Sequence, residues 1–469
     1  MATSPTPACP PAVAPGGLPV LGHALELKRR PGEFLLALQS GDPVVRLRLG
    51  RSPAFVVNDP ALIREVLLDP TTFARGGPIT ERFRQMFGNG LGISDGPLHR
   101  RQRAVLAPAF SHAHVAEYAA TMTEVADAVV GRWREGEVVH VEKEMDELAL
   151  AVVTRVVFSD GIDDPRRFME ATGIVLSGLF RRVTDTTGVL TRMPMRANRR
   201  YDAARAYLRQ TIDDVISRRR EHGHLQGDLL SLMLSAVDED GRPAMDDTQL
   251  HDEVMTLFIA GSNTISNTLA WALYEVATHR NVEARLHAEV DDVLDERPAA
   301  FDDLPLLGYT RRVVAETLRV RTQGLFLAKV TTAPAELGGY SIPAGATVVY
   351  SFHALNHNPL IHPDPERFDP DRWLPERAER IPKGAFMPFA VGLHGCIAEH
   401  FAWTEMEIAL ATVAARWQLA TVPGHVPRPV RAITMPVDAL PMIPTRRDHA
   451  SRTFRPDRRP IAAGARHGD

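Results

Sequence analysis

Apolar residues recur at helical spacing over most of this chain. Six segments place them three and four residues apart, as one buried face of an α-helix requires: 113–135, 142–158, 200–221, 247–280, 281–296 and 308–320. The span 247–280 is unusually long for a single helix. Asp246 could cap its start, and Gln249 could complete a capping box. The pattern predicts a mainly helical protein that contains one long helix.

Two shorter segments alternate in the way strands do. Apolar residues of 45–49 alternate with arginines, and Gly50 turns the chain into 54–57. A second hairpin pattern lies at 337–351, where glycine and proline interrupt β-branched and aromatic residues. Because these strands are few and do not alternate with helices, we expect a mainly α (α+β) fold with small peripheral sheets.

The chain has no long internal linker and no internal repeat. Residues 1–17 are rich in proline and alanine, and residues 446–469 are rich in arginine without an apolar period. We therefore expect two disordered tails that flank one large domain over residues 18–445.

Charge and composition exclude some classes of partner. The net charge is -4, from 54 basic and 58 acidic side chains, so no nucleic-acid partner is indicated. No apolar run approaches the ~18 residues that span a membrane, and the first residues do not form a signal peptide. A disulfide between Cys9 and Cys396 is poorly motivated. We expect a cytoplasmic protein without a membrane segment.

Cys396 lies in a glycine-rich loop, FAVGLHGCIA, directly before a helical run. A cysteine at a helix N-terminus meets backbone N–H groups and the positive end of the helix dipole, which favour the metal-binding thiolate. Gly392 and Gly395 permit a tight loop that brings the backbone close to a flat cofactor. The alternative is a buried cysteine that acts as a small hydrophobic side chain.

This segment resembles the haem-binding signature of the cytochromes P450, Phe-x-x-Gly-x-[Arg/His]-x-Cys-x-Gly. Phe389, Gly392, His394 and Cys396 match it, and Ala398 stands where glycine is usual. The resemblance implies a haem b cofactor whose iron is held by Cys396. Ala398 adds one methyl group, which we expect to shift the following helix slightly.

Four further motifs of that family occur in the family's order. They are His99-x-x-x-Arg103, Ala260-Gly261-x-Asn263-Thr264, Glu316-x-x-Arg319 and Pro365-Glu366-Arg367-Phe368. Each is weak alone, but the ordered set, within a resemblance that covers about residues 17–437, is specific.

The resemblance assigns roles to these residues. His99, Arg103 and His394 would contact the haem propionates. Lys329 stands where an arginine is usual, so the expected binding of the propionates is weaker at that position. The side chains that would form a buried ion-pair network supporting the cysteine loop are Glu316, Arg319 and Arg367.

The expected catalytic residues lie on the long helix. Gly261 would leave room for oxygen, and the hydroxyl of Thr264 would hydrogen-bond to it. Asn263 replaces the usual acid and cannot titrate, so protons would arrive through Thr264 and ordered water. Gln323, in a segment that is often proline-rich in the family, is expected to place a polar group in the pocket.

The resemblance implies a haem-thiolate monooxygenase that uses dioxygen and electrons from a separate ferredoxin-type donor with its reductase. Segments 14–25, 197–202, 338–351 and 368–378 look like those of actinobacterial sesquiterpene oxygenases. They imply a small apolar terpene substrate, hydroxylated or further oxidised in secondary metabolism.

Three alternatives remain open. Asn263 allows a haem-dependent rearrangement without reductant. Asp291, Asp292 and Asp295 spell the magnesium-diphosphate motif of terpene cyclases, although a solvated acidic helix face also explains them. The departures near the haem allow a ligand-binding protein without turnover.

Overall fold

The structure is a computed structural model that describes residues 10–18, 22–49, 52–159, 161–184, 193, 195–222, 228–238, 240–430 and 434–447. Residues 1–9 and 448–469, which make up most of the two expected tails, lie outside the described residues.

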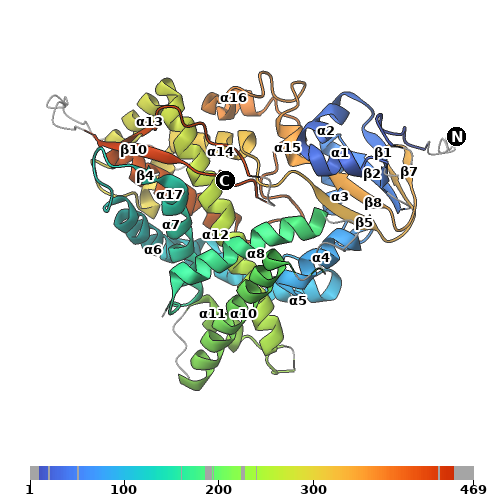
Figure 1. The fold of residues 1–469 in the computed structure, drawn as a ribbon, viewed down its shortest axis with the longest axis horizontal. Helices are drawn as coiled ribbons and strands as arrows, with labels where there is room; N and C mark the ends of the chain where they lie inside the picture. Colours follow the sequence, from blue (N-terminus) through green and yellow to red (C-terminus); the bar gives the residue numbers. More distant parts are fainter. Residues whose placement is uncertain are drawn as a thin grey trace, which may run out of the picture.

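Helices form most of the molecule, so the mainly helical prediction is confirmed (Figure 1). The longer helices are α3 (Pro60–Leu68), α4 (Gly77–Phe87), α5 (Gly96–Leu106), α6 (His112–Val130), α7 (Val141–Val157), α8 (Pro165–Thr184), α10 (Arg196–His222), α12 (Asp247–Thr278), α13 (Arg280–Val293), α14 (Gly308–Val320) and α17 (Glu399–Arg416). The shorter ones include α1 (Ala24–Arg29), α2 (Pro31–Ala37), α11 (Leu229–Ser235), α15 (Phe352–Asn356) and α16 (Pro375–Ala378). The six predicted segments match observed helices, except that α6 ends before Gly131.

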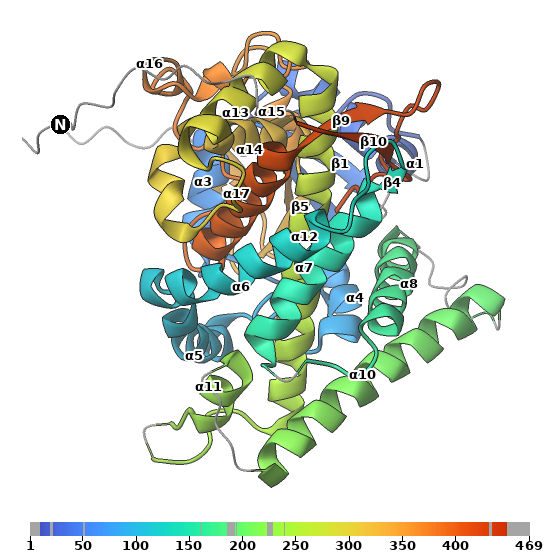
Figure 2. The same cartoon turned by 90° about the vertical axis from the view of Figure 1, so that its left-hand side faces the viewer.

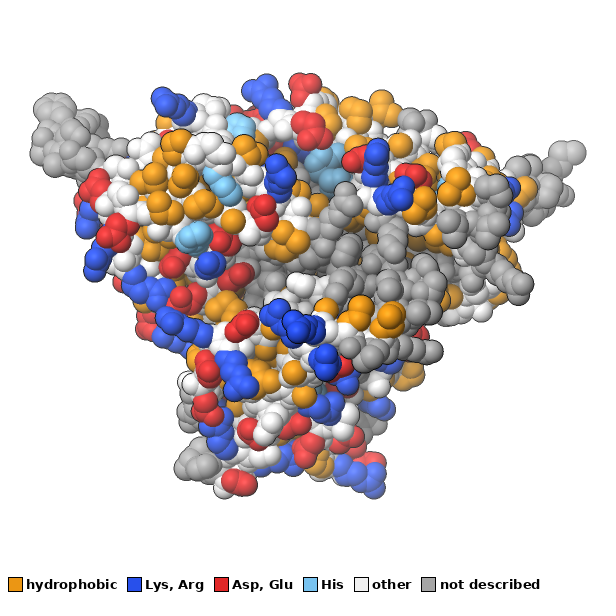
Figure 3. All heavy atoms as spheres, viewed as in Figure 1, with side chains coloured by type: hydrophobic (Ala, Val, Ile, Leu, Met, Phe, Trp, Pro, Cys, Tyr) orange, Lys and Arg blue, Asp and Glu red, His pale blue; other side chains and the backbone are white. Residues whose placement is uncertain are grey.

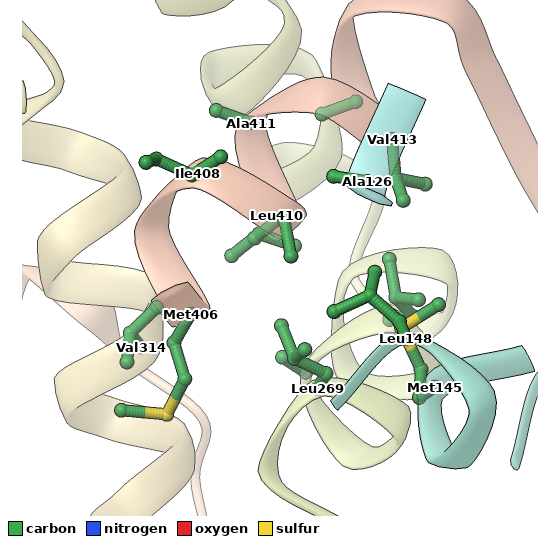
Figure 4. Close-up of a cluster of buried hydrophobic side chains, with 14 of the residues drawn as sticks. Ala126, Met145, Leu148, Leu269, Val314, Met406, Ile408, Leu410, Ala411 and Val413 are labelled. Carbon is green, nitrogen blue, oxygen red and sulfur yellow. The ribbon is translucent and has the colours of Figure 1, made fainter. Parts of the chain in front are cut away.

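Helix α12 runs through the middle of the molecule, with α7 beside it (Figure 2). It packs against α7, α14 and α17 through one large apolar cluster. In Figure 4, Leu269 of α12 lies near Leu148 of α7 and Leu410 of α17. Full burial of each such side chain stabilises the fold by roughly 1.5–3 kcal/mol. This packing fixes the helix that carries the expected catalytic residues.

The start of α12 is only partly as predicted. The side chain of Asp246 accepts a hydrogen bond from the backbone N–H of Gln249 at 2.8 Å, so the cap is confirmed. The side chain of Gln249 instead donates to the carboxylate of Glu253 at 2.8 Å and the carbonyl of Asn89 at 3.3 Å. The expected capping box is therefore wrong, because these tertiary acceptors take the Gln249 amide.

The largest sheet has the strand order β1-β2-β8-β5-β3 and lies at one side of the molecule (Figure 1). Its strands are β1 (Val44–Leu49), β2 (Ser52–Val57), β3 (Phe73–Ala74), β5 (Leu327–Thr331) and β8 (Thr347–Tyr350). The antiparallel pair β1–β2 confirms the first predicted hairpin. A second sheet is formed by β4 (Val139–His140), β10 (Pro441–Arg446) and β9 (Trp417–Thr421).

The second predicted hairpin, 337–351, is wrong in its pairing. Strand β7 (Tyr340–Ile342) pairs with β6 (Ala335–Leu337), and Gly338 and Gly339, both at positive φ, form the turn between them. Strand β8 leaves this pair and runs parallel to β2 and antiparallel to β5. The buried position of Val348 in the larger sheet decides this pairing.

The expected domain boundaries are also displaced. Arg46 of β1 donates its backbone N–H to the carbonyl of Ala12 and accepts one from Ala14, whose side chain is buried. Ala12 and Ala14, which belong to the segment expected to be disordered, therefore pair with the sheet. At the other end, Arg446 closes β10 and Arg447 pairs with Asp291 at 2.7 Å.

The predicted ion-pair network exists with a different third arginine. Glu316 and Arg319 are fully buried, and their carboxylate and guanidinium groups meet at 2.8 Å. The guanidinium of Arg372, in the 3-10 helix η4 (Pro370–Trp373), lies 3.4 Å from the same carboxylate. Arg367 has an exposed side chain and contributes only its backbone carbonyl, which accepts from Arg319 at 3.2 Å. The residue-by-residue match to the family motif therefore selected Arg367, whereas the structure places Arg372 beside Glu316.

The surface carries charges of both signs, which Figure 3 shows over the lower part of the molecule where α10 and α11 lie. Among the helices that the structure describes, none is long and apolar enough to cross a membrane.

Candidate active site

A cavity of about 380 Å³ lies between α12 and the cysteine loop. Most of its lining is apolar and comes from α7, α12 and the segment around residues 388–406. Seven of the predicted site residues line it: His99, Arg103, Gly261, Thr264, Phe389, His394 and Cys396. The long-range fold therefore brings together motifs that are far apart in the sequence.

The cysteine loop is closed by backbone hydrogen bonds. Cys396 donates its N–H to the carbonyl of Phe389 at 2.8 Å, and Gly395 donates to Gly392 at 3.0 Å. Gly392 has a φ of 77°, and a Cβ there would meet the carbonyl oxygen of Leu67 at 2.8 Å. Glycine is thus required at this position for two reasons, the dihedral angle and the space.

Ala398, the departure from the signature, sits at the N-cap of α17 with a φ of −99°. This is an ordinary backbone conformation for alanine, so the position does not demand glycine. Phe389 packs its ring against Trp403 with 5.8 Å between centroids. This ring contact anchors the loop to α17.

The thiol of Cys396 borders the cavity and is exposed to it, although protein atoms surround the residue. Burial raises the pKa of the Cys396 thiol, and a backbone hydrogen bond from Ala398 lowers it by a smaller amount. The backbone N–H at the helix end therefore favours the thiolate, as expected, but burial favours the neutral thiol more strongly. A bound cation would have to supply the remaining stabilisation, as metal binding to cysteine generally does.

Basic side chains gather at one end of the cavity. Arg75, His99, Arg103 and His394 line it, and Lys329 lies behind His394. Arg103 donates to the carbonyl of Gly395 at 2.8 Å, which ties α5 to the cysteine loop.

A short chain of hydrogen bonds orients His394. Its Nδ1 lies 2.7 Å from the ammonium of Lys329, and its Nε2 lies 3.0 Å from the carboxylate of Asp95. The network therefore assigns Nδ1 as acceptor and Nε2 as donor. Lys329 is 3% exposed and does not line the cavity, so it acts on this end of the cavity through His394.

The charges in this cluster are not balanced. Burial, followed by the nearby charge of Arg75, lowers the pKa of Lys329 to about 8 and that of His99 to about 3. Burial also lowers the pKa of Arg75 to about 10. Burial raises the pKa of Asp95, but hydrogen bonds from His394, Gly96 and Arg75 hold it well below its usual value. One carboxylate thus faces several cations and donors.

His99 adds a second sign of an incomplete site. Its Nδ1 is buried and has no hydrogen-bond partner within the described part of the chain. Buried polar atoms of this kind are normally satisfied. A largely apolar cavity with excess donors at one end and a thiol in its wall fits the haem expected from the sequence, whose two carboxylates would meet the donors.

Helix α12 forms the wall that carries the expected catalytic residues. Gly261 lies against α7, where an added Cβ would be 2.8 Å from a methyl group of Val153. The hydroxyl of Thr264 donates to the carbonyl of Ala260 at 2.8 Å and borders the cavity. Asn263 does not line the cavity, so this predicted site residue is not brought to the others.

Sequence reasoning missed Arg75 and Asp95. Arg75 donates to the carbonyls of Leu91 and His394, at 2.7 and 3.3 Å, and so links three segments of the site. No local pattern marks it, since its burial depends on the pairing of β3 with β5. Asp95 had a usable signal, because an aspartate directly before Gly-Pro and a helical run is a typical N-cap.

The sequence and the fold were compared with known proteins. The family profile described as Cytochrome P450 matches residues 11–439. Cyclooctat-9-en-7-ol 5-monooxygenase of Streptomyces melanosporofaciens is 42% identical over 413 residues, covering 88% of this chain and 90% of that protein. Pentalenene oxygenase of Streptomyces avermitilis is 36% identical over 424 residues, covering 90% and 94%. The crystal structure of the cytochrome P450DA haem domain matches with a TM-score of 0.85 at 29% identity, covering 94% of this chain and 98% of that chain.

Proposed function

The chain belongs to the cytochrome P450 family of haem-dependent monooxygenases, and from this premise we propose that it inserts oxygen into a small, apolar terpene. The observation that carries the proposal is one cavity in which the Cys396 thiol, the Gly261–Thr264 turn of α12 and a cluster of basic side chains are all wall residues. These are the parts that thiolate-ligated haem chemistry needs.

The residues present can hold the cofactor. In this proposal the Cys396 thiolate would hold the haem iron, and His99, Arg103, Arg75 and His394 would bind the propionates. Lys329 supports His394 and does not itself reach the cavity. Haem held by a cysteine thiolate supplies dioxygen activation, because the thiolate favours cleavage of the O–O bond.

The chain's own residues leave room beside α12, transfer protons and exclude water from the cavity. Gly261 keeps α12 free of a side chain beside the cavity, and the Thr264 hydroxyl can turn from the Ala260 carbonyl to pass a proton. Asn263 cannot titrate and lies outside the cavity wall, so water must deliver protons to Thr264. The apolar lining positions the substrate and excludes bulk water.

The names of the relatives suggest the substrate class. One is named for cyclooctat-9-en-7-ol and another for pentalenene, so a cyclic terpene fits this chain best. We further propose that a ferredoxin-type protein with its reductase supplies the electrons and that the enzyme works in the cytoplasm.

The cyclase alternative is not supported by the acidic motif. Asp291 is buried in α13 and pairs with Arg447 at 2.7 Å. The described residues contain no cluster of three or more acidic, histidine or cysteine side chains that could hold a metal ion. In this proposal the motif is therefore a structural part of the end of α13 and of the turn that follows it.

Reconstituted turnover tests the proposal. The holoenzyme is incubated with cyclooctat-9-en-7-ol or pentalenene, a ferredoxin, its reductase and NADPH under isotopically labelled dioxygen. We expect a product that gains one labelled oxygen and depends on reductant. Product formation without reductant would instead identify a rearrangement, and magnesium-dependent diphosphate release from a prenyl diphosphate would identify a cyclase.

A further inference from the structure

Gln323 lies in the loop between α14 and β5 and forms part of the cavity wall. Two other polar residues of that wall, Thr264 and Thr268, stand one helical turn apart on α12. Gln323 donates to the hydroxyl of Thr268, so the three residues form a continuous polar strip. The neighbouring wall positions, which include Leu257, Ile265 and Leu318, are apolar.

The hydrogen bonds of the Gln323 amide are incomplete. Its Nε2 donates to the Thr268 hydroxyl and to the Arg321 carbonyl, each at 3.3 Å. Both amide hydrogens are therefore engaged. Its Oε1 is buried and has no donor within hydrogen-bond distance in the described part of the chain. Leaving a buried amide oxygen unpaired is costly, so such an atom is expected to have a partner.

The donor groups of the two residues that Gln323 contacts are already committed. The Thr268 hydroxyl donates to the Thr264 carbonyl at 2.7 Å. The guanidinium of Arg321 pairs with Glu275 at 2.6 Å and stacks on the ring of Trp271 at 4.1 Å. The donor for the Gln323 oxygen must therefore come from outside these side chains.

We propose that Gln323 accepts a hydrogen bond from a hydroxyl group of the substrate, so that the enzyme acts on a terpene that is already an alcohol. The inference deepens the proposed function, because it concerns the same cavity. The terminal torsion of glutamine is soft, so the amide can turn its oxygen into the cavity when a donor arrives. A terpene hydrocarbon would leave the oxygen unpaired, which is the basis for discrimination.

The proposal places the reaction in a sequence. The substrate hydroxyl must be installed before this step, either by water capture at the end of terpene cyclisation or by an earlier hydroxylation. This enzyme would then oxidise a second carbon of the substrate. The separation between Gln323 and the reacting centre would set the distance between that carbon and the first oxygen.

Ligand binding tests the inference without turnover. Rigid pairs of an alcohol and its hydrocarbon, cedrol with cedrene and phyllocladanol with phyllocladene, are titrated into the haem-loaded full chain by spectral shift and calorimetry. We expect the protein to bind the alcohol of at least one pair about tenfold more tightly, the size of one neutral hydrogen bond. Gln323→Leu should abolish this preference by weakening alcohol binding alone.

Thr256→Val is the matched control. Thr256 also lines the cavity, but its hydroxyl is committed to the Asp252 carbonyl at 2.8 Å, so the preference should survive. Equal affinity for alcohol and hydrocarbon in every pair, or an unchanged preference in Gln323→Leu, would overturn the inference. So would equal weakening of both ligands, which would assign Gln323 to cofactor or water binding. Failure of the proposed function is distinct, since it would remove the haem-thiolate spectrum or oxygen-dependent turnover themselves.

Discussion

At the scale of single residues, Gly261 shows how one missing side chain shapes the site. It lies on α12 against Val153 of α7, beside the cavity, and an added Cβ would come within 2.8 Å of a valine methyl. Valine has little freedom to move this methyl, because its χ1 is restricted in a helix. The contact between the two helices therefore depends on glycine at this position.

Gly261→Ala should destabilise the fold by about 1–3 kcal/mol, the usual cost of overpacking a core contact. Urea unfolding monitored by circular dichroism measures it. Gly173→Ala is the control, because Gly173 lies in α8 with nothing near its added Cβ, and alanine there should stabilise by up to about 1 kcal/mol. Equal effects of the two substitutions would contradict the packing role of Gly261.

The residues that could be predicted are those whose chemistry is marked locally. The segment around Cys396 and the His99–Arg103 pair carry their signals within ten residues or fewer, and all three side chains reach the cavity. Arg75 could not be found, because its place depends on a distant strand pairing. The raised pKa of Cys396 was missed because burial is not visible in sequence.

At the scale of elements, α14 is joined to η4 by the buried carboxylate of Glu316. It accepts hydrogen bonds from Arg319 at 2.8 Å and from the indole of Trp373 at 3.0 Å, and it lies 3.4 Å from Arg372. If Arg372 is removed, Arg319 still compensates the charge of Glu316, but the Glu316 carboxylate and the Pro363 carbonyl, which lies 3.0 Å from Arg372, each lose a buried donor.

Arg372→Ala should therefore lower the free energy of unfolding by about 1–3 kcal/mol, the cost of leaving buried acceptors without their donor. Arg367→Ala, at the arginine that the family motif favoured, should stay within about 0.5 kcal/mol because its side chain is exposed. Chemical denaturation of both variants measures the difference. A larger loss in Arg367→Ala would restore the motif's assignment and contradict the structure.

Elements were predictable where their pattern is local. The long helix α12 and its cap at Asp246 follow from apolar spacing and a single side chain. The prediction of a hairpin at 337–351 failed because strand β8 pairs with β2 and β5 and is buried in the larger sheet. The capping box failed because Gln249 has tertiary acceptors.

At the scale of the whole molecule, buried carboxyl groups make stability depend on pH. Glu405 of α17 is 1% exposed, and neither of its carboxyl oxygens has a partner among the described residues. Burial raises its pKa well above the ordinary value of 4.5. The folded state therefore binds the proton of Glu405 more tightly than the unfolded state does. The stability that this protonated carboxyl group contributes is present below about pH 4.5 and is lost as pH rises toward the folded-state pKa.

Glu405→Gln should remove that loss, because the amide stays neutral. At pH 8 we expect Glu405→Gln to be more stable than the parent. The difference should be about 1.4 kcal/mol for each unit by which the folded-state pKa of Glu405 is raised, counted only as far as pH 8. Near pH 4 the difference should be small. Denaturation at several pH values measures this. Glu379→Gln is the control, because the Glu379 side chain is exposed. Parallel pH profiles for the parent and Glu405→Gln would contradict the account.

The mainly helical fold was predictable as a whole because helical spacing dominates the chain, and the solved P450DA structure supports it. The tail boundary at residue 17 was not, because the pairing of Ala12 and Ala14 with Arg46 is a long-range event in a proline-rich segment without strand pattern.

The central claim is that Cys396 is the thiolate ligand of a haem. The carbon monoxide difference spectrum of the dithionite-reduced, haem-loaded protein tests it most directly, with Cys396→Ser as the matched variant. We expect the long-wavelength Soret band of thiolate-ligated haem, and its loss in Cys396→Ser. The shorter-wavelength band in the parent protein, or a thiolate-type band that persists in Cys396→Ser, would contradict it.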